Sequence, residues 1–121
     1  MAITLGAIVL DAADLETESR FWQRLLGGSV VKKERHHIVE SGGAPILAVQ
    51  LAPEHVPPDW PTGQPQQMHL DLAVDDIAEA HRQAVEAGAR VLESTIDDAA
   101  PSGYRVFADP AGHPFCLCWG D

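Results

Sequence analysis

An internal repeat constrains the fold of this chain more than any other feature of its sequence. Residues 7–15 and residues 69–77 share one pattern, in which a short strand ends in an acidic turn. Helical spacing of apolar residues follows over 15–26 and again over 76–87, with Asp14 and either Asp75 or Asp76 as expected N-caps. Each helix is expected to end at glycine and to lead into a β-branched segment.

Further strands are predicted at 37–40 and 46–51 in the first copy, and at 104–108 and 114–119 in the second. Residues 52–66 carry five prolines, which favours an extended connection between the copies. We therefore expect one α+β domain over residues 1–121, with module one at about 1–51 and module two at about 67–121. Two tandem βαβββ modules would form curved mixed sheets around a central cleft, with the helices on the outer face.

Alternation along the strands divides each sheet into an apolar face and a face of small and polar residues. The fifth strand sets Met68, Leu70, Leu72 and Val74 against His69, Asp71 and Ala73. The last strand sets Phe115, Leu117 and Trp119 against Cys116 and Cys118. We expect the apolar face to pack on the helices and the other to line a ligand cavity or to meet a partner chain. A solvated outer face is the simpler alternative.

The charge balance limits the partners of the chain. Eight basic and eighteen acidic side chains give a formal net charge of −10, which repels nucleic acid and anionic membranes. No apolar run approaches the roughly 20 residues of a membrane span, and the start does not resemble a signal peptide. A cytoplasmic protein without nucleic-acid or membrane partners is expected. Cys116 and Cys118, two residues apart in a strand, are expected to be free thiols.

Several motifs, in this order and over nearly the whole chain, resemble the vicinal-oxygen-chelate superfamily of glyoxalases, bleomycin resistance proteins and extradiol dioxygenases. The motifs are Asp14-Leu15-Glu16 with Phe21-Trp22, His69-Leu70-Asp71-Leu72, Ala87-Gly88-Ala89, and Asp109-Pro110-Ala111-Gly112-His113. The segment from Pro65 to Leu72, together with residues 109–118, looks more narrowly like small bacterial glyoxalase-like proteins.

The resemblance also implies a metal site, and this chain departs from it. Metal-using relatives take one ligand from each of the first, fourth, fifth and eighth strands, and the matching positions here are Ala7, Gln50, His69 and Cys116. Alanine cannot coordinate, and the set lacks the carboxylates that balance a divalent cation. We therefore expect a degenerate site with no metal and no cofactor. A soft-metal site of His69, Cys116 and Cys118 is the alternative, with Gln50 or Asp71 as a further donor.

The favoured hypothesis is that the protein binds a small organic molecule. It would sequester this cationic or aromatic compound, as the antibiotic-resistance members of the superfamily do. The expected ligand-binding residues are Gln50, Trp60, His69, Asp71, Arg105 and Cys116. A lyase, isomerase or dioxygenase is the alternative, with His69 as acid–base beside Asp71 or as part of an unusual metal site. A third hypothesis is an interaction module that binds no small ligand and whose cavity is filled by its own side chains. The resemblance also implies a homodimer.

The remaining histidines and Trp60 have weaker patterns. His36 and His37 are expected in a solvated hairpin beside a run of charged residues. The other three, His55, His81 and His113, show no partner pattern, and a turn that ends in glycine explains the place of His113. Trp60 lies in the proline-rich segment, where it either covers the pocket and stacks on a planar ligand or anchors the segment.

Overall fold

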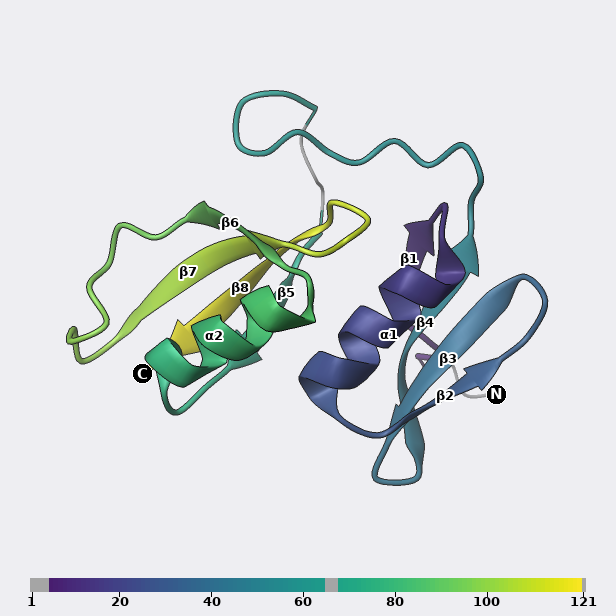
Figure 1. The fold of residues 1–121 in the computed structure, drawn as a ribbon, viewed down its shortest axis with the longest axis horizontal. Helices are drawn as coiled ribbons and strands as arrows, with labels where there is room; N and C mark the ends of the chain where they lie inside the picture. Colours follow the sequence, from purple (N-terminus) through teal and green to yellow (C-terminus); the bar gives the residue numbers. More distant parts are fainter. Residues whose placement is uncertain (1–4, 65–67, 121) are drawn as a thin grey trace. The chain divides into compact units, whose positions relative to one another are not determined.

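The computed structural model describes residues 5–64 and 68–120, and within them the chain repeats one order of elements twice (Figure 1). The chain divides into two compact units, 1–55 and 56–121, and the boundary falls inside the proline-rich segment. Pro65 and Gln66, the last residues of that predicted segment, lie outside the described residues. The predicted α+β fold of two βαβββ modules is confirmed.

The first unit is a four-stranded mixed sheet with one helix packed on it (Figure 1). Its elements are β1 (Val9–Ala12), α1 (Leu15–Leu26), β2 (Ser29–Lys32), β3 (His36–Ser41) and β4 (Ala44–Leu51). The sheet order is β1-β4-β3-β2, in which β1 runs parallel to β4 and the other pairs are antiparallel. Phe21 and Trp22 from the helix and Val39 and Val49 from the sheet are buried at 0–1% exposure.

The second unit repeats this arrangement. Its elements are β5 (Leu70–Ala73), α2 (Ile77–Ala87), β6 (Arg90–Glu93), β7 (Gly103–Ala108) and β8 (Pro114–Trp119). The sheet order is β5-β8-β7-β6, with β5 parallel to β8, and α2 packs on β8 (Figure 1). Phe107 and Phe115 stack with ring centroids 5.6 Å apart, and they form the core of this unit with Leu117 and Ala84.

The helix ends follow the capping chemistry expected from the sequence. The Asp14 carboxylate accepts a hydrogen bond from the Thr17 N–H at 3.1 Å, and Asp76, not Asp75, accepts one from the Glu79 N–H at 3.1 Å. Both helices end at a glycine with positive φ, 80° at Gly27 and 123° at Gly88. A residue with a Cβ is strained in that conformation, so these glycines set where each helix stops.

Two details of the predicted secondary structure are wrong. The fifth strand spans only Leu70–Ala73, and the Met68 side chain, predicted to pack on a helix, is 82% exposed. His37 is not in a solvated hairpin. It is buried under α1, where its Nδ1 atom lies 2.8 Å from the Ser19 hydroxyl, because position 37 of β3 faces the helix. Among the described residues, no helix is long and apolar enough to cross a membrane.

Candidate functional site

The second unit carries a pocket of about 380 Å³ on the sheet face that α2 does not cover. Its lining combines aromatic, ionisable and thiol side chains with two apolar residues. The lining residues are Trp60, His69, Asp71, Tyr104, Val106, Pro114, Cys116 and Cys118. Four of the six ligand-binding residues expected from the sequence, Trp60, His69, Asp71 and Cys116, thus meet in one pocket.

The strand register explains why these side chains share a face. Asp71 of β5 pairs with Cys116 of β8, and Cys116 pairs on its other side with Val106 of β7. Paired residues project to the same side of a sheet, so these three form one row across the pocket. Cys118 and Tyr104 form a second row by the same pairing. The remaining polar residue, His69, directly precedes β5 and lines the same pocket, with its ring 3.2 Å from the Asp71 carboxylate.

His69 and Asp71 form the polar end of the pocket. The His69 Nε2 atom lies 3.2 Å from the Asp71 Oδ1 atom, and the two side chains are 47% and 62% exposed. Both groups are therefore accessible to a ligand from solvent. A carboxylate at this distance can accept a hydrogen bond from the imidazole N–H and so orient the histidine as an acid–base group.

The two thiols form the less polar part of the wall. Burial raises the pKa of the Cys116 thiol to about 11, and the nearby negative charge of Asp71 adds to the effect. The pKa of Cys118 is raised by the same two causes. Both cysteines are free, as the sequence predicted, and at neutral pH they present neutral S–H groups to the pocket.

Trp60 reaches the pocket from the proline-rich segment. The backbone N–H of Asp59 donates to the Gln64 carbonyl at 2.7 Å, and the Gly63 N–H donates to the Asp59 carbonyl at 2.7 Å. These bonds close a turn that holds the indole against the second unit. Trp60 is only partly buried, so part of its ring remains available to a ligand.

Gln50 belongs to the first unit and lines a pocket there, of about 410 Å³. It pairs with Asp11 of β1 and with His36 of β3, so the three project from one face of that sheet. Ala7, the first position of the expected metal set, also lines this pocket and precedes β1. The sheet face opposite its helix is thus hollowed in each unit, in agreement with the alternation read from the sequence.

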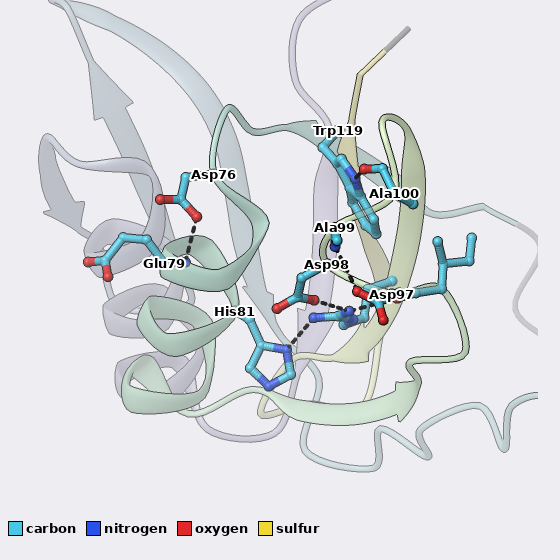
Figure 2. A network of polar contacts seen from close by, with 10 residues as sticks. Asp76, Glu79, His81, Asp97, Asp98, Ala99, Ala100 and Trp119 are labelled. Atoms are coloured by element: carbon cyan, nitrogen blue, oxygen red, sulfur yellow. Dashed lines mark hydrogen bonds and ion pairs between the residues drawn. The ribbon is translucent and has the colours of Figure 1, made fainter.

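The predicted place of Arg105 in the pocket is wrong. Arg105 is one residue out of phase with Tyr104 and Val106, so it projects to the helix side of the sheet and is 6% exposed. Its guanidinium donates to the Ile96 carbonyl at 3.0 Å, pairs with Asp98 at 2.5 Å and lies 5.7 Å from the Trp119 ring centroid. Figure 2 shows Asp98, His81 and Trp119 around this position.

His81 and His113 both have partners that the sequence pattern did not reveal. Arg105 donates to the His81 Nδ1 atom at 3.0 Å, and since arginine has no acceptor, Nδ1 is unprotonated there (Figure 2). The His113 ring lies 2.8 Å from the buried Asp109 carboxylate, which also accepts from the His113 backbone N–H. The first pair joins β7 to α2, and the second lies within the turn between β7 and β8, so periodicity within one strand predicts neither.

The metal set of the superfamily does not fit the residues at its positions. The Ala7 methyl group offers no donor, and Gln50 offers only a neutral amide in the first unit. Only His69 and Cys116 remain, both in the second unit. The residues at these four positions therefore do not form the four-strand metal site.

The repeated βαβββ order is that of a glyoxalase-like domain. Residues 7–118 match the model of the glyoxalase-like domain, and the chain belongs to that family. No curated protein sequence matches it significantly.

Solved structures of the same fold are similar over nearly their whole length. A fosfomycin resistance protein from Listeria monocytogenes is 15% identical, with 100% of this chain and 96% of that chain covered and a TM-score of 0.72. A glyoxalase-related enzyme from Fulvimarina pelagi is 22% identical, with 97% and 88% covered and a TM-score of 0.70. A glyoxalase/bleomycin resistance protein from Albidiferax ferrireducens is 15% identical, with 97% and 98% covered and a TM-score of 0.69.

Proposed function

We propose that the pocket of the second unit binds and sequesters a small organic molecule with a planar cationic group, without an essential metal. One observation carries the proposal: two aromatic side chains, Trp60 and Tyr104, line the same pocket as the exposed carboxylate of Asp71. Aromatic faces attract cations through their quadrupole, and a carboxylate supplies the opposite charge. Together they suit a flat cation.

The size and charge of the site support the same ligand class. A volume of about 380 Å³ lies in the range of pockets that take small organic molecules. The net charge of −10 attracts cations to the surface and disfavours anionic ligands. Neutral thiols, Val106 and Pro114 add apolar contact area for the body of the ligand.

The names of the structural neighbours are compatible with sequestration and with catalysis. One is named a fosfomycin resistance protein, one a glyoxalase/bleomycin resistance protein and one a glyoxalase-related enzyme. One fold hosts unrelated functions, so the choice between them depends on the residues of the pocket.

The experiment is a thermal-shift screen of tag-free protein with chelator present, in which bleomycin serves as a cationic glycopeptide probe beside flat aromatic cations and matched neutral analogues. A ligand at 100 times its dissociation constant should stabilise the protein by about 2.7 kcal/mol. We expect stabilisation by cations, recovery of the compound unchanged, and weaker binding by Asp71→Asn. Equal shifts from charged and neutral analogues would refute the cationic ligand class.

An enzyme is the second candidate, because His69 and Asp71 lie 3.2 Å apart with both groups exposed. That geometry suits a general base held by a carboxylate, in a lyase, isomerase or dioxygenase of the superfamily. Turnover of a keto-aldehyde or a catechol, lost in His69→Ala, would favour this function over sequestration.

We further propose that the protein acts as a cytoplasmic homodimer. The pocket face of the first unit leaves the apolar side chains of Val9 and Ile46 49% and 39% exposed, which a second chain would cover, and small oligomers prefer twofold symmetry. Light scattering at micromolar protein tests the assembly, and a monomer mass that does not change with concentration would reject it.

A further inference from the structure

The carboxylate and the tyrosine ring of the second-unit pocket stand on different strands. The sheet order is β5-β8-β7-β6, so Asp71 of β5 and Tyr104 of β7 lie on opposite sides of β8. Asp71 pairs with Cys116, whereas Tyr104 pairs with Cys118, two residues further along β8. The two side chains are therefore diagonal to each other across the central strand of the pocket.

The strand register sets the distance between these two side chains. Neighbouring strands lie about 4.8 Å apart, and a strand rises about 3.3 Å per residue. Two strand spacings and two residues therefore separate the Cα atoms of Asp71 and Tyr104 by roughly 11–12 Å. Both side chains line the same pocket, so a single ligand can contact both only if it is elongated.

The pocket floor between the two side chains is uncharged at neutral pH. Cys116 and Cys118 of β8 and Val106 of β7 line it, and burial raises the pKa of both thiols, which keeps them as S–H groups. Asp71 is the one acidic residue among the described lining residues. Sulfur atoms make favourable contacts with aromatic rings. The floor therefore suits an uncharged aromatic body, with the positive charge of the ligand at one end.

A one-ring cation covers only part of the diagonal. An amidinium group, for example, binds a carboxylate through two parallel hydrogen bonds of about 2.8 Å. The Asp71 carboxylate can accept them beside His69, because its two oxygens offer about four lone-pair sites. A ring attached to that cation ends before Tyr104, and a second ring in line with the first reaches it. Two rings attract each other in edge or offset contact at centroid distances of about 4.5–7 Å.

We propose that the ligand of this pocket is a rod-shaped monocation, with a planar N–H cation held by Asp71 at one end and an uncharged aromatic ring held by Tyr104 at the other. The inference rests on the proposed function and narrows its ligand class. Asp71 selects for charge, whereas Tyr104 selects for length.

The test compares three amidines by isothermal titration of tag-free protein. Benzamidine carries its cation on one ring, and para-phenylbenzamidine adds a second ring in line with the first. Its isomer, ortho-phenylbenzamidine, has the same atoms but carries the second ring to the side, so it controls for apolar area. We expect para-phenylbenzamidine to bind roughly 3–10-fold more tightly than either of the others, as one added aromatic contact predicts.

Variants assign the two ends of the ligand. Tyr104→Ala should bring the ratio of the para-phenylbenzamidine and benzamidine affinities close to one, and Tyr104→Phe should keep the wild-type ratio. Asp71→Asn should weaken all three amidines by a similar factor. Val85→Ala removes another exposed apolar side chain, on α2 and outside the pocket lining, and should keep the wild-type ratio. Circular dichroism checks the fold of each variant.

The orientation of the ligand can be measured in the wild-type protein, without any variant. Tyr104 is the only tyrosine of the chain, so isotope labelling of tyrosine gives the NMR signals of a single ring. We expect nuclear Overhauser effects between this ring and the phenyl ring of para-phenylbenzamidine that does not carry the amidine.

The outcomes separate this inference from the proposed function. Equal affinities of the para and ortho isomers, with both lowered by Asp71→Asn, would overturn the rod-shaped ligand and leave a cationic ligand in place. Overhauser effects from Tyr104 to the amidine-bearing ring alone would overturn it as well, because the cation would then lie at the wrong end. Amidines that bind no more tightly than benzamide and para-phenylbenzamide, their neutral analogues, would overturn both proposals.

Discussion

The Nε2 atom of His69 lies 3.2 Å from the Oδ1 atom of Asp71, and both side chains are largely open to solvent. A pair with this exposure contributes little to folding, because solvent screens the attraction between its charges. Asp71 is nevertheless held on a fixed face of the sheet by the register between β5 and β8, and His69 directly precedes β5. This combination of fixed position and open access is typical of binding residues rather than core residues.

Replacement of His69 by alanine should therefore separate binding from stability. His69→Ala should weaken binding of an organic cation while the free energy of unfolding stays within about 0.5 kcal/mol of wild type. Leu117→Ala, at a side chain 1% exposed on the opposite face, should lower the free energy of unfolding by about 2–5 kcal/mol. Urea denaturation and a binding titration measure the two effects. Comparable destabilisation by both changes would make His69 a core residue.

Loss of the Trp60 ring should weaken binding of a flat cation without unfolding the protein. Cation–π contacts contribute about 1–2 kcal/mol when partly desolvated, so Trp60→Ala should lower affinity roughly 5–30-fold. Trp60→Phe retains an aromatic face and should recover part of the affinity. Isothermal titration with a cationic compound and its neutral analogue measures the difference. An equal loss for both compounds would mean that Trp60 provides contact area alone.

The fold was largely predictable because its signals are local. Capping aspartates, helix-ending glycines and strand alternation each depend on neighbouring residues, and the repeat presents them twice. Alternation also separated His69 and Asp71 from Leu70 and Leu72, and this placed the polar pair in the pocket. The ends of β5 were less predictable, since Met68 continues the alternation but lies beyond the paired strand.

The errors arose where a side chain finds its partner far away in the sequence. Alternation puts Arg105 and Tyr104 on opposite faces but does not say which face is the pocket, and a cation is more often exposed than buried. The structure buries Arg105 because Asp98 and the Ile96 carbonyl satisfy its charge. Tyr104 and Val106 were missed for the same reason, since only pairing with β8 shows which face they share. Pro114 was missed although it alternates in phase with Cys116 and Cys118 along β8.

Arg105 should accordingly be a stability residue rather than a ligand contact. Arg105→Ala removes hydrogen bonds to His81, Ile96 and Asp98, and charged hydrogen bonds contribute about 1.5–3 kcal/mol each, so we expect a loss of roughly 2–3 kcal/mol after rehydration of the partners. Arg82→Ala removes an exposed arginine from α2 and should change stability by less than about 1 kcal/mol. Equal effects of the two changes on the free energy of unfolding in urea would refute a stabilising role for the hydrogen bonds of Arg105.

The thiol of Cys116 should react slowly with iodoacetamide at neutral pH. Burial and the negative charge of Asp71 raise its pKa to about 11, so only a small fraction is thiolate, and thiolate is the species that reacts. In a Cys118→Ser background with chelator present, the alkylation rate should rise roughly tenfold per pH unit until the pH approaches this pKa.

Because the folded-state pKa is raised, Cys116 stabilises the fold below the pKa of an unfolded thiol, and that contribution is lost as the pH rises toward 11. The double variant with Cys116→Ala should lack that alkaline loss, and Asp71→Asn should shift the alkylation profile to lower pH. A rate that levels off near the ordinary thiol pKa of about 8.5 would show that neither burial nor Asp71 acts on this group.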